Sequence, residues 1–267
     1  MLFITIALHA QRFVNTTLDG AQAVYAITQD TSGVVWLGTD NGLYSYDGYH
    51  DYRHFASHTF SHIRINALGF EGSMLYLATG NGMLKFDTQK GIYASAPAME
   101  SDGDKGRKKA VRELRVLNMK GRKDAFGNDV YAILHTQKGL LVGSLAGLRL
   151  NQRQILLTPG AQPLVNALAY DAKRHCYWIG TEGALYCADQ ALQNFSKIAA
   201  LDGNSVKCLD EDQNGNLYIG TDNGLYRMAM NNSLEHFVHD SRNEATIPNN
   251  IVWSCYVDKW QNVWIGT

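Results

Sequence analysis

The chain has 267 residues, of which 45% are hydrophobic, and its formal net charge is −1. This balance supplies enough apolar material for one sizeable globular domain and excludes a general attraction to nucleic acid or to an anionic membrane. With 25 glycines, 14 tyrosines and only 4 prolines, the composition favours short strands joined by tight turns.

The first eleven residues differ from the rest of the chain. Residues 1–11 are mostly apolar and end in Ala10 and Gln11, which is typical of the end of a secretory leader peptide. A basic start is missing and Leu8 is bulky for a cleavage site, so a first β-strand is the alternative. We expect a truncated leader peptide, because the segment precedes the repeats and matches none of them. Neither this segment nor any other is long enough to span a bilayer.

A sequence repeat fills the remainder of the chain. The string Gly-Thr-Asp-Asn-Gly-Leu-Tyr occurs unchanged at residues 38–44 and at residues 220–226. Equivalent positions fall at residues 38, 78, 143, 180, 220 and 266, so the intervals are 40, 65, 37, 40 and 46 residues. Apart from one insertion, this is the period of propeller blades. The blade motifs lie near residues 24–47, 63–87, 129–150, 165–188, 204–228 and 251–267.

Each copy predicts three strands and a less regular fourth, separated by turns rich in Asp, Asn and Gly. The second strand is apolar at consecutive residues, as at Val35, Trp36 and Leu37, which is typical of a strand buried on both faces. A parallel β-helix has much shorter rungs, and a helical solenoid requires a 3.6-residue period that the repeat lacks.

The sequence therefore predicts an all-β fold: a β-propeller of four-stranded antiparallel blades over residues 12–267. About six repeats are present, the sixth cut off at Thr267, and the complete form is expected to be seven-bladed. A large aromatic residue and, two residues later, a glycine recur in the second strands and are interpreted as structural core. These core positions are Trp36, Tyr76, Trp178, Tyr218, Trp264, Gly38, Gly143, Gly180, Gly220 and Gly266.

Asp30, Gly33, Trp36, Leu37, Gly38 and Thr39, followed by Gly42 and Leu43, form a pattern that resembles the two-component regulator propeller repeat. The last copy, from Asp258 to Thr267, resembles it too, whereas the second and third copies are degenerate at Ala78 and Ser144. The resemblance implies a periplasmic sensor region of a hybrid two-component histidine kinase. Many members of that family sense oligosaccharides and switch on glycan-use genes. It also implies that membrane and kinase parts belong to a longer parent.

The insertion near residues 97–126 is the most individual feature of the sequence. Nine basic residues lie between Lys105 and Lys123, and only Glu113 opposes them. An anion-binding lip for an acidic glycan is the functional hypothesis, and a solvated surface loop is the alternative. The candidate ligand-binding residues in this segment are Arg107, Lys108, Lys109, Arg112 and Arg115.

A second candidate surface follows the first repeat. Tyr49, Tyr52 and His54 could stack on a sugar and donate hydrogen bonds to it, or they could belong to an outer strand of alternating exposure. Other histidines nearby have a helical spacing in a strand context, which argues against a metal site.

No catalytic motif, metal site or cofactor is predicted. Asp30, Asp171, Asp212 and Asp258 recur with the repeat, which indicates turn capping and not catalysis. Residues 210–215 match only the first half of a calcium loop, because the twelfth position is Thr221. Cys176 and Cys187 flank one hairpin and are interpreted as free thiols, with a disulfide as the alternative.

The sequence favours a non-enzymatic, exported sensor. Its expected partners are an oligosaccharide or other small ligand, the downstream signalling domains of a parent receptor and, in a homodimer, a second copy of the chain. Nucleic acid is not expected. A propeller glycosidase or lyase, and a protein-binding scaffold propeller, are the alternatives.

Overall fold

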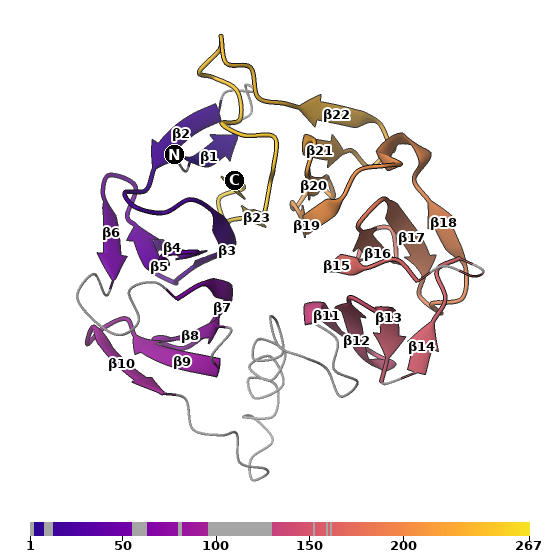
Figure 1. Cartoon of the computed structure of the whole chain (residues 1–267), viewed down its shortest axis with the longest axis horizontal. Helices are drawn as coiled ribbons and strands as arrows, with labels where there is room; N and C mark the ends of the chain where they lie inside the picture. The colour runs from indigo at the N-terminus through magenta and orange to yellow at the C-terminus, as the bar shows by residue number, and fades with distance from the viewer. Residues whose placement is uncertain are drawn as a thin grey trace. The chain divides into compact units, whose positions relative to one another are not determined.

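The computed structural model describes residues 3–7, 13–54, 63–79, 82–95, 130–151, 153–158, 160 and 162–267. These residues form six four-stranded antiparallel sheets and one 3-10 turn, η1 (Ala199–Leu201) (Figure 1). The chain divides into two compact units, which we describe separately. One consists of Gly20–Asp129, and the other consists of Met1–Asp19 together with Val130–Thr267.

The unit Gly20–Asp129 holds two sheets, each formed by one continuous stretch of chain. In both sheets consecutive strands pair with one another, so that each sheet is a simple meander. The first sheet contains β3 (Val24–Gln29), β4 (Val35–Thr39), β5 (Gly42–Tyr46) and β6 (Asp51–His54). The second contains β7 (Ile65–Glu71), β8 (Met74–Thr79), β9 (Gly82–Asp87) and β10 (Ile92–Ser95).

The other unit holds three further meanders of the same kind. The first contains β11 (Val130–Thr136), β12 (Gly139–Ser144), β13 (Gly147–Leu150) and β14 (Arg153–Ile155). The second contains β15 (Val165–Asp171), β16 (Cys176–Thr181), β17 (Leu185–Asp189) and β18 (Phe195–Lys197). The third contains β19 (Val206–Glu211), β20 (Leu217–Thr221), β21 (Gly224–Met228) and β22 (Leu234–Phe237).

The last sheet of this unit combines the two ends of the chain. β23 (Ser254–Val257) pairs with β24 (Val263–Gly266), which pairs with β1 (Phe3–Ala7), and β1 pairs with β2 (Phe13–Thr17). The free edge of β24 is therefore covered by four residue pairs from Ile4–Gly266 to Ala7–Val263. Two strands of one repeat thus come from the C-terminal end and two from the N-terminal end.

This composite sheet bears on two predictions. Residues 3–7 form the third strand of a sheet, and a first strand is the alternative that the sequence left open. The sixth repeat, which was predicted to be cut off at Thr267, is completed to four strands by β1 and β2. Five sheets come from continuous stretches and one from both ends, so the described strands give no support to a seven-bladed form. The repeat pattern could not indicate this pairing, because its two halves lie at opposite ends of the chain.

The predicted aromatic residues occupy equivalent places on the second strands. Trp36, Tyr76, Trp178, Tyr218 and Trp264 are all at most 7% exposed. Around them each second strand is almost wholly buried, as in β4, β16 and β20. Burial on both faces explains why these strands have no alternation of apolar and polar residues.

In four of the six second strands, a glycine lies against the first strand of the following sheet. A Cβ atom built on Gly180 would lie 2.5 Å from Val206 Cγ1, and one built on Gly143 would lie 2.5 Å from Val165 Cγ1. The same contact joins Gly38 to Ile65 and Gly220 to Val252. Adjacent sheets therefore pack so closely that no side chain fits at the glycine position.

We expect Gly180→Ala to lower the free energy of unfolding by about 1–3 kcal/mol, because its methyl group overpacks against Val206. Gly183, in the turn of the same hairpin, has no atom within 4 Å of an added Cβ and provides the control. Gly183→Ala should leave stability close to that of the wild type. Chemical denaturation measures both, and equal effects of the two substitutions would contradict the close packing.

Candidate functional site

The recurring aspartates cap turns in the way that the sequence predicts. At Asp171, Oδ1 accepts hydrogen bonds from the backbone N–H groups of Lys173 and Arg174 at 3.0 and 2.7 Å. Its Oδ2 accepts from Trp178 Nε1 at 3.1 Å. Each equivalent carboxylate also accepts from turn N–H groups and from the aromatic residue of its second strand; the pairs are Asp30–Trp36, Asp212–Tyr218 and Asp258–Trp264.

The environment of Asp171 keeps its carboxylate ionised. Burial opposes the charge, but hydrogen bonds from Arg174 and Trp178 outweigh it and hold the pKa of Asp171 below its usual value. The pKa of Asp30 is lowered in the same way, with burial again opposed by hydrogen bonds, from Ser32 and Trp36 among others. The carboxylate oxygens of Asp171 and Asp30 are thus occupied by hydrogen bonds from turn N–H groups and tryptophan side chains, which fits the turn-capping role predicted from the sequence.

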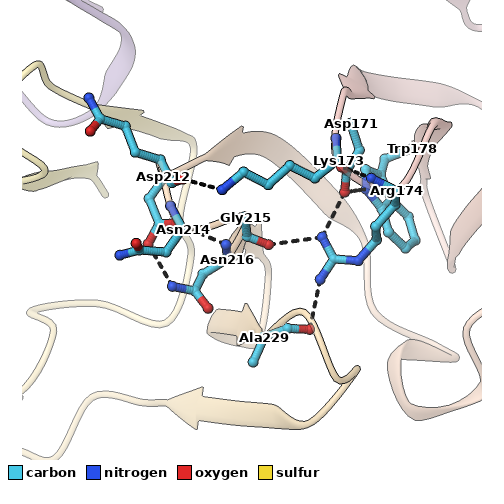
Figure 2. A network of polar contacts seen from close by, with 10 residues as sticks. Asp171, Lys173, Arg174, Trp178, Asp212, Asn214, Gly215, Asn216 and Ala229 are labelled. Atoms are coloured by element: carbon cyan, nitrogen blue, oxygen red, sulfur yellow. Dashed lines mark hydrogen bonds and ion pairs between the residues drawn. The ribbon is translucent and has the colours of Figure 1, made fainter.

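Figure 2 shows a polar clasp between the β15–β16 turn and the sheet that follows. Arg174 Nη1 donates to Asp171 Oδ2 at 2.7 Å and to the carbonyl oxygen of Gly215 at 2.9 Å, and Nη2 donates to Ala229 O at 2.7 Å. The neighbouring Lys173 Nζ donates to the carbonyl oxygen of Gln213. The Arg174–Asp171 ion pair is buried, with side-chain exposures of 12% and 0%. This cluster joins adjacent sheets through two hydrogen bonds from Nη1 and one from Nη2 of Arg174.

Asp210 lies at the boundary between β19 and β23. Its Oδ2 accepts a hydrogen bond from Val257 N at 2.7 Å, and its Oδ1 accepts from Glu211 N at 2.9 Å. Burial nevertheless dominates and raises the pKa of Asp210 to about 6. No basic side chain is among the causes of this shift, so the carboxyl group is a titrating acid within the fold.

All four cysteines are free thiols, and they lie in two neighbouring pairs. A hydrogen bond between the thiols of Cys176 and Cys187 raises the pKa of Cys176 and lowers the pKa of Cys187 to about 7. A similar contact with Cys208, together with burial, raises the pKa of Cys255. The structure thus has the reduced state that the sequence favours for the hairpin pair.

Of the predicted ligand residues, the structure describes only Tyr49, Tyr52 and His54. Arg107, Lys108, Lys109, Arg112 and Arg115 lie outside the described residues. Tyr49 and Tyr52 are 88% and 54% exposed, Tyr49 in the turn before β6 and Tyr52 on β6 itself.

His54, also on β6, points into the sheet packing. Its ring stacks on Trp36 at 5.0 Å between centroids, its Nε2 bonds Ser45 Oγ at 2.8 Å, and burial lowers its pKa. His54 is therefore partly buried against Trp36, while Tyr49 and Tyr52 are exposed.

A different set of residues shares one position in the repeat. The pairing of first and second strands shifts by one residue near the start of β11, β15 and β19, and the extra residues are Tyr131, Asn166 and Lys207. Trp253 takes the same place ahead of β23, where its N–H donates to Gly266 O at 2.8 Å. We call these four residues the bulge row. β-Bulges re-aim side chains and are enriched beside functional sites.

The bulge row crosses four neighbouring first strands of one unit (Figure 1). Tyr131 is 39% exposed, and the other three are partly exposed. Lys207 Nζ lies 5.3 Å from the centroid of the Trp253 ring, a cation–π arrangement. Asn166 Nδ2 contacts Glu182 Oε2 at 3.5 Å. Aromatic faces beside amide and ammonium donors can stack on a sugar ring and bond its hydroxyl groups.

The unit Gly20–Asp129 has the same feature on its own first strands. The shifts in β3 and β7 leave Tyr25 and Asn66 as the extra residues. The guanidinium carbon of Arg64 lies 3.8 Å from the centroid of the Tyr25 ring. The sequence did not predict a site at this position. The signal present in all six copies is a variable residue between a β-branched residue and a small residue, and a comparison of repeats looks for residues that agree.

The described residues contain no group of three or more His, Cys, Asp or Glu side chains arranged to hold a metal ion. Within the same residues, no helix has the length and the apolar character that crossing a membrane requires.

Comparison with known proteins gives a consistent picture. A family model described as Two component regulator propeller matches residues 19–41 and 200–223. A solved extracellular domain assigned to the hybrid two-component system BT4673 of B. thetaiotaomicron is 31% identical, with a TM-score of 0.80. The match covers 96% of this chain and 39% of that chain. A second structure of the BT4673 domain, assigned to a one-component system, is 29% identical, with the same TM-score and coverage.

A more distant structure shares the fold alone. The extracellular domain assigned to the hybrid two-component system BT3049 of B. thetaiotaomicron is 18% identical with a TM-score of 0.54, covering 100% of this chain and 41% of that chain. A search of curated proteins gave no match. This chain thus spans about two fifths of the length of the solved relatives, 39% in the case of BT4673.

The sheet topology and these matches define an all-β propeller protein built of antiparallel blades. Within that class, its repeats are two-component regulator propeller repeats, and the chain belongs to this family.

The clasp predicts a difference between two adjacent basic residues. Arg174→Ala removes one partner of a buried ion pair and should lower the free energy of unfolding by about 3–5 kcal/mol. Lys173→Ala removes an exposed contact and should cost less than about 1 kcal/mol. Urea denaturation of the two variants checks this, and a cost for Arg174→Ala as small as that of the control would show that the clasp adds little stability.

Asp210 predicts a pH dependence of opposite direction to that of the capping aspartates. The folded protein binds a proton on the Asp210 carboxyl group more tightly than the unfolded chain does. The stabilising contribution of this protonated group to the free energy of unfolding is therefore fully present below about pH 4 and is lost as the pH rises through about 6. The unfolding free energy of Asp210→Asn, relative to wild type, should therefore rise by about 2–3 kcal/mol from pH 4 to pH 7. Denaturation at both pH values tests this, and a constant difference would refute it.

Proposed function

We propose that this chain is the extracytoplasmic ligand-sensing part of a two-component receptor, and that its ligand is an oligosaccharide. The observation that carries the proposal is the likeness to the BT4673 extracellular domain, which extends over 96% of this chain at 31% identity. In this proposal the parent is a hybrid histidine kinase, and ligand binding controls transcription of glycan-use genes.

The physical character of the described residues supports binding without turnover. The recurring carboxylates are held by turn N–H groups and by tryptophan or tyrosine side chains, so they are not placed as an acid–base pair. The surface that differs between repeats consists of aromatic, amide and cationic side chains at the bulge positions. Closely packed blades form a rigid support on which such side chains can be varied.

Signalling places a further requirement on the ligand. It must bind one arrangement of the parent receptor more tightly than another, because only a difference in affinity can shift the equilibrium between them. We propose that the downstream domains, and a second copy of the chain in a homodimer, supply that difference in arrangement. The proposed compartment is the periplasm, in keeping with the extracellular location given for the relatives.

We expect the purified chain to be stabilised by an oligosaccharide and to leave that oligosaccharide intact. Ligand that binds only the folded state raises the unfolding temperature, by an amount set by its concentration relative to the dissociation constant. A thermal-shift screen against plant and host oligosaccharides, followed by mass spectrometry of the recovered sugar, makes the measurement. Cleavage of the sugar would identify a propeller glycosidase or lyase instead, and capture of a protein with no response to any sugar would favour a scaffold.

A further inference from the structure

At the bulge position the residue varies among the six copies, while the residues on both sides keep one chemical type. The residue before it is always β-branched and apolar, and the residue after it is always small. The preceding residues are Val24, Ile65, Val130, Val165, Val206 and Val252, and the following residues are Ala26, Ala67, Ala132, Ala167, Cys208 and Ser254. Between them stand Tyr25, Asn66, Tyr131, Asn166, Lys207 and Trp253.

Packing explains why the flanks are fixed. The β-branched residue is at most 2% exposed in every copy. In four copies, at Ile65, Val165, Val206 and Val252, it fills the space beside the glycine of the preceding sheet. The pairing of the first and second strands shifts by one residue at this position, as at Tyr131, Asn166 and Lys207, so the regular register of the ladder skips it. Neither the core nor the sheet therefore dictates its identity, and the residues found there are large aromatic, amide or cationic types.

The Lys207–Trp253 pair within the bulge row points to the charge of the ligand. Lys207 is partly buried, and no carboxylate of the described residues lies within 4.0 Å of its ammonium nitrogen. Its ammonium nitrogen lies over the face of the Trp253 ring, 5.3 Å from the centroid. A cation that has lost part of its water without gaining an acidic partner interacts favourably with an anionic ligand.

The same chemistry recurs in the other unit. Arg64 rests on the ring of Tyr25, and the described residues again provide no carboxylate within 4.0 Å of its guanidinium group. Two copies of the bulge thus combine an aromatic face with a cation that has no carboxylate of the described residues within 4.0 Å. An acid near the row, Glu182, contacts Asn166 and not Lys207. This distribution directs a ligand carboxylate or sulfate toward the Lys207 end.

We propose that the bulge row binds an acidic oligosaccharide, with a sugar ring stacked on Trp253 and a uronate carboxylate or sulfate paired with Lys207. Tyr131 and Asn166 contact the following sugar residues along the row. This inference rests on the proposed sensing function and deepens it by naming the residues and the chemical class of the ligand.

The test uses one oligomer in two forms. The probes are an α-1,4-linked galacturonic acid oligomer and the same oligomer after reduction of its carboxyl groups to alcohols, so only the charge differs. We expect the full chain to bind the acidic form at least about tenfold more tightly in calorimetric titration, as a charged hydrogen bond predicts.

Lys207→Met keeps the length of the side chain and removes its charge. It should abolish the preference for the acidic form, and Trp253→Ala should weaken binding of both forms. The chain offers a matched control in Lys259, whose ammonium nitrogen lies 4.3 Å from the centroid of the Trp260 ring, outside the bulge row. Lys259→Met should bind both oligomers as the wild type does. Unfolding temperatures equal to that of the wild type show that each variant is folded.

The outcomes separate this inference from the proposed function. If the wild type binds the acidic oligomer and Lys207→Met binds it equally well, the bulge row is not the site and sensing still stands. If both oligomers bind equally to the wild type, the acidic class is wrong. If the wild type binds neither form but responds to another sugar in the thermal-shift screen, this inference fails alone. If no sugar produces a response, the sensing proposal fails with it.

Discussion

The contact between a glycine and a β-branched residue of the next sheet sets the spacing of the blades. Gly143 and Gly180 lie so close to Val165 and Val206 that a methyl group would not fit without movement. This spacing brings the aromatic residues of the second strands into contact with their neighbours and buries both faces of each sheet. The rest of the architecture, including the polar clasp around Arg174, depends on this short distance between adjacent sheets.

Much of the fold could be predicted from the sequence, because the determinants recur at fixed spacing. The buried aromatic residues, the close-packed glycines and the capping role of Asp30, Asp171, Asp212 and Asp258 all follow from features that each repeat carries by itself. The composite sheet could not be predicted in this way. Its pairing joins residues 3–7 to residues 263–266, and a single repeat contains no information about which distant strand completes it.

The candidate site was less accessible to sequence reasoning, for a physical reason. Tyr49, Tyr52 and His54 looked alike as polar aromatic residues after a strand, but His54 packs against Trp36 and the tyrosines do not. Exposure depends on which face of β6 meets the neighbouring sheet, and a short irregular strand does not reveal this. The bulge positions were not predicted as a site because repeats are recognised by residues that are identical or similar between copies. The residues at the bulge positions instead vary from copy to copy.

The register shift at the start of each first strand has an evolutionary consequence. Since the register shift leaves the extra residue out of the regular pairing of the two strands, a mutation of its side chain should cost little in folding stability. Gene duplication of such a repeat would copy the scaffold together with an unconstrained position. Under the proposed binding role, new specificities could then arise by single substitutions at Tyr131, Asn166, Lys207 and Trp253.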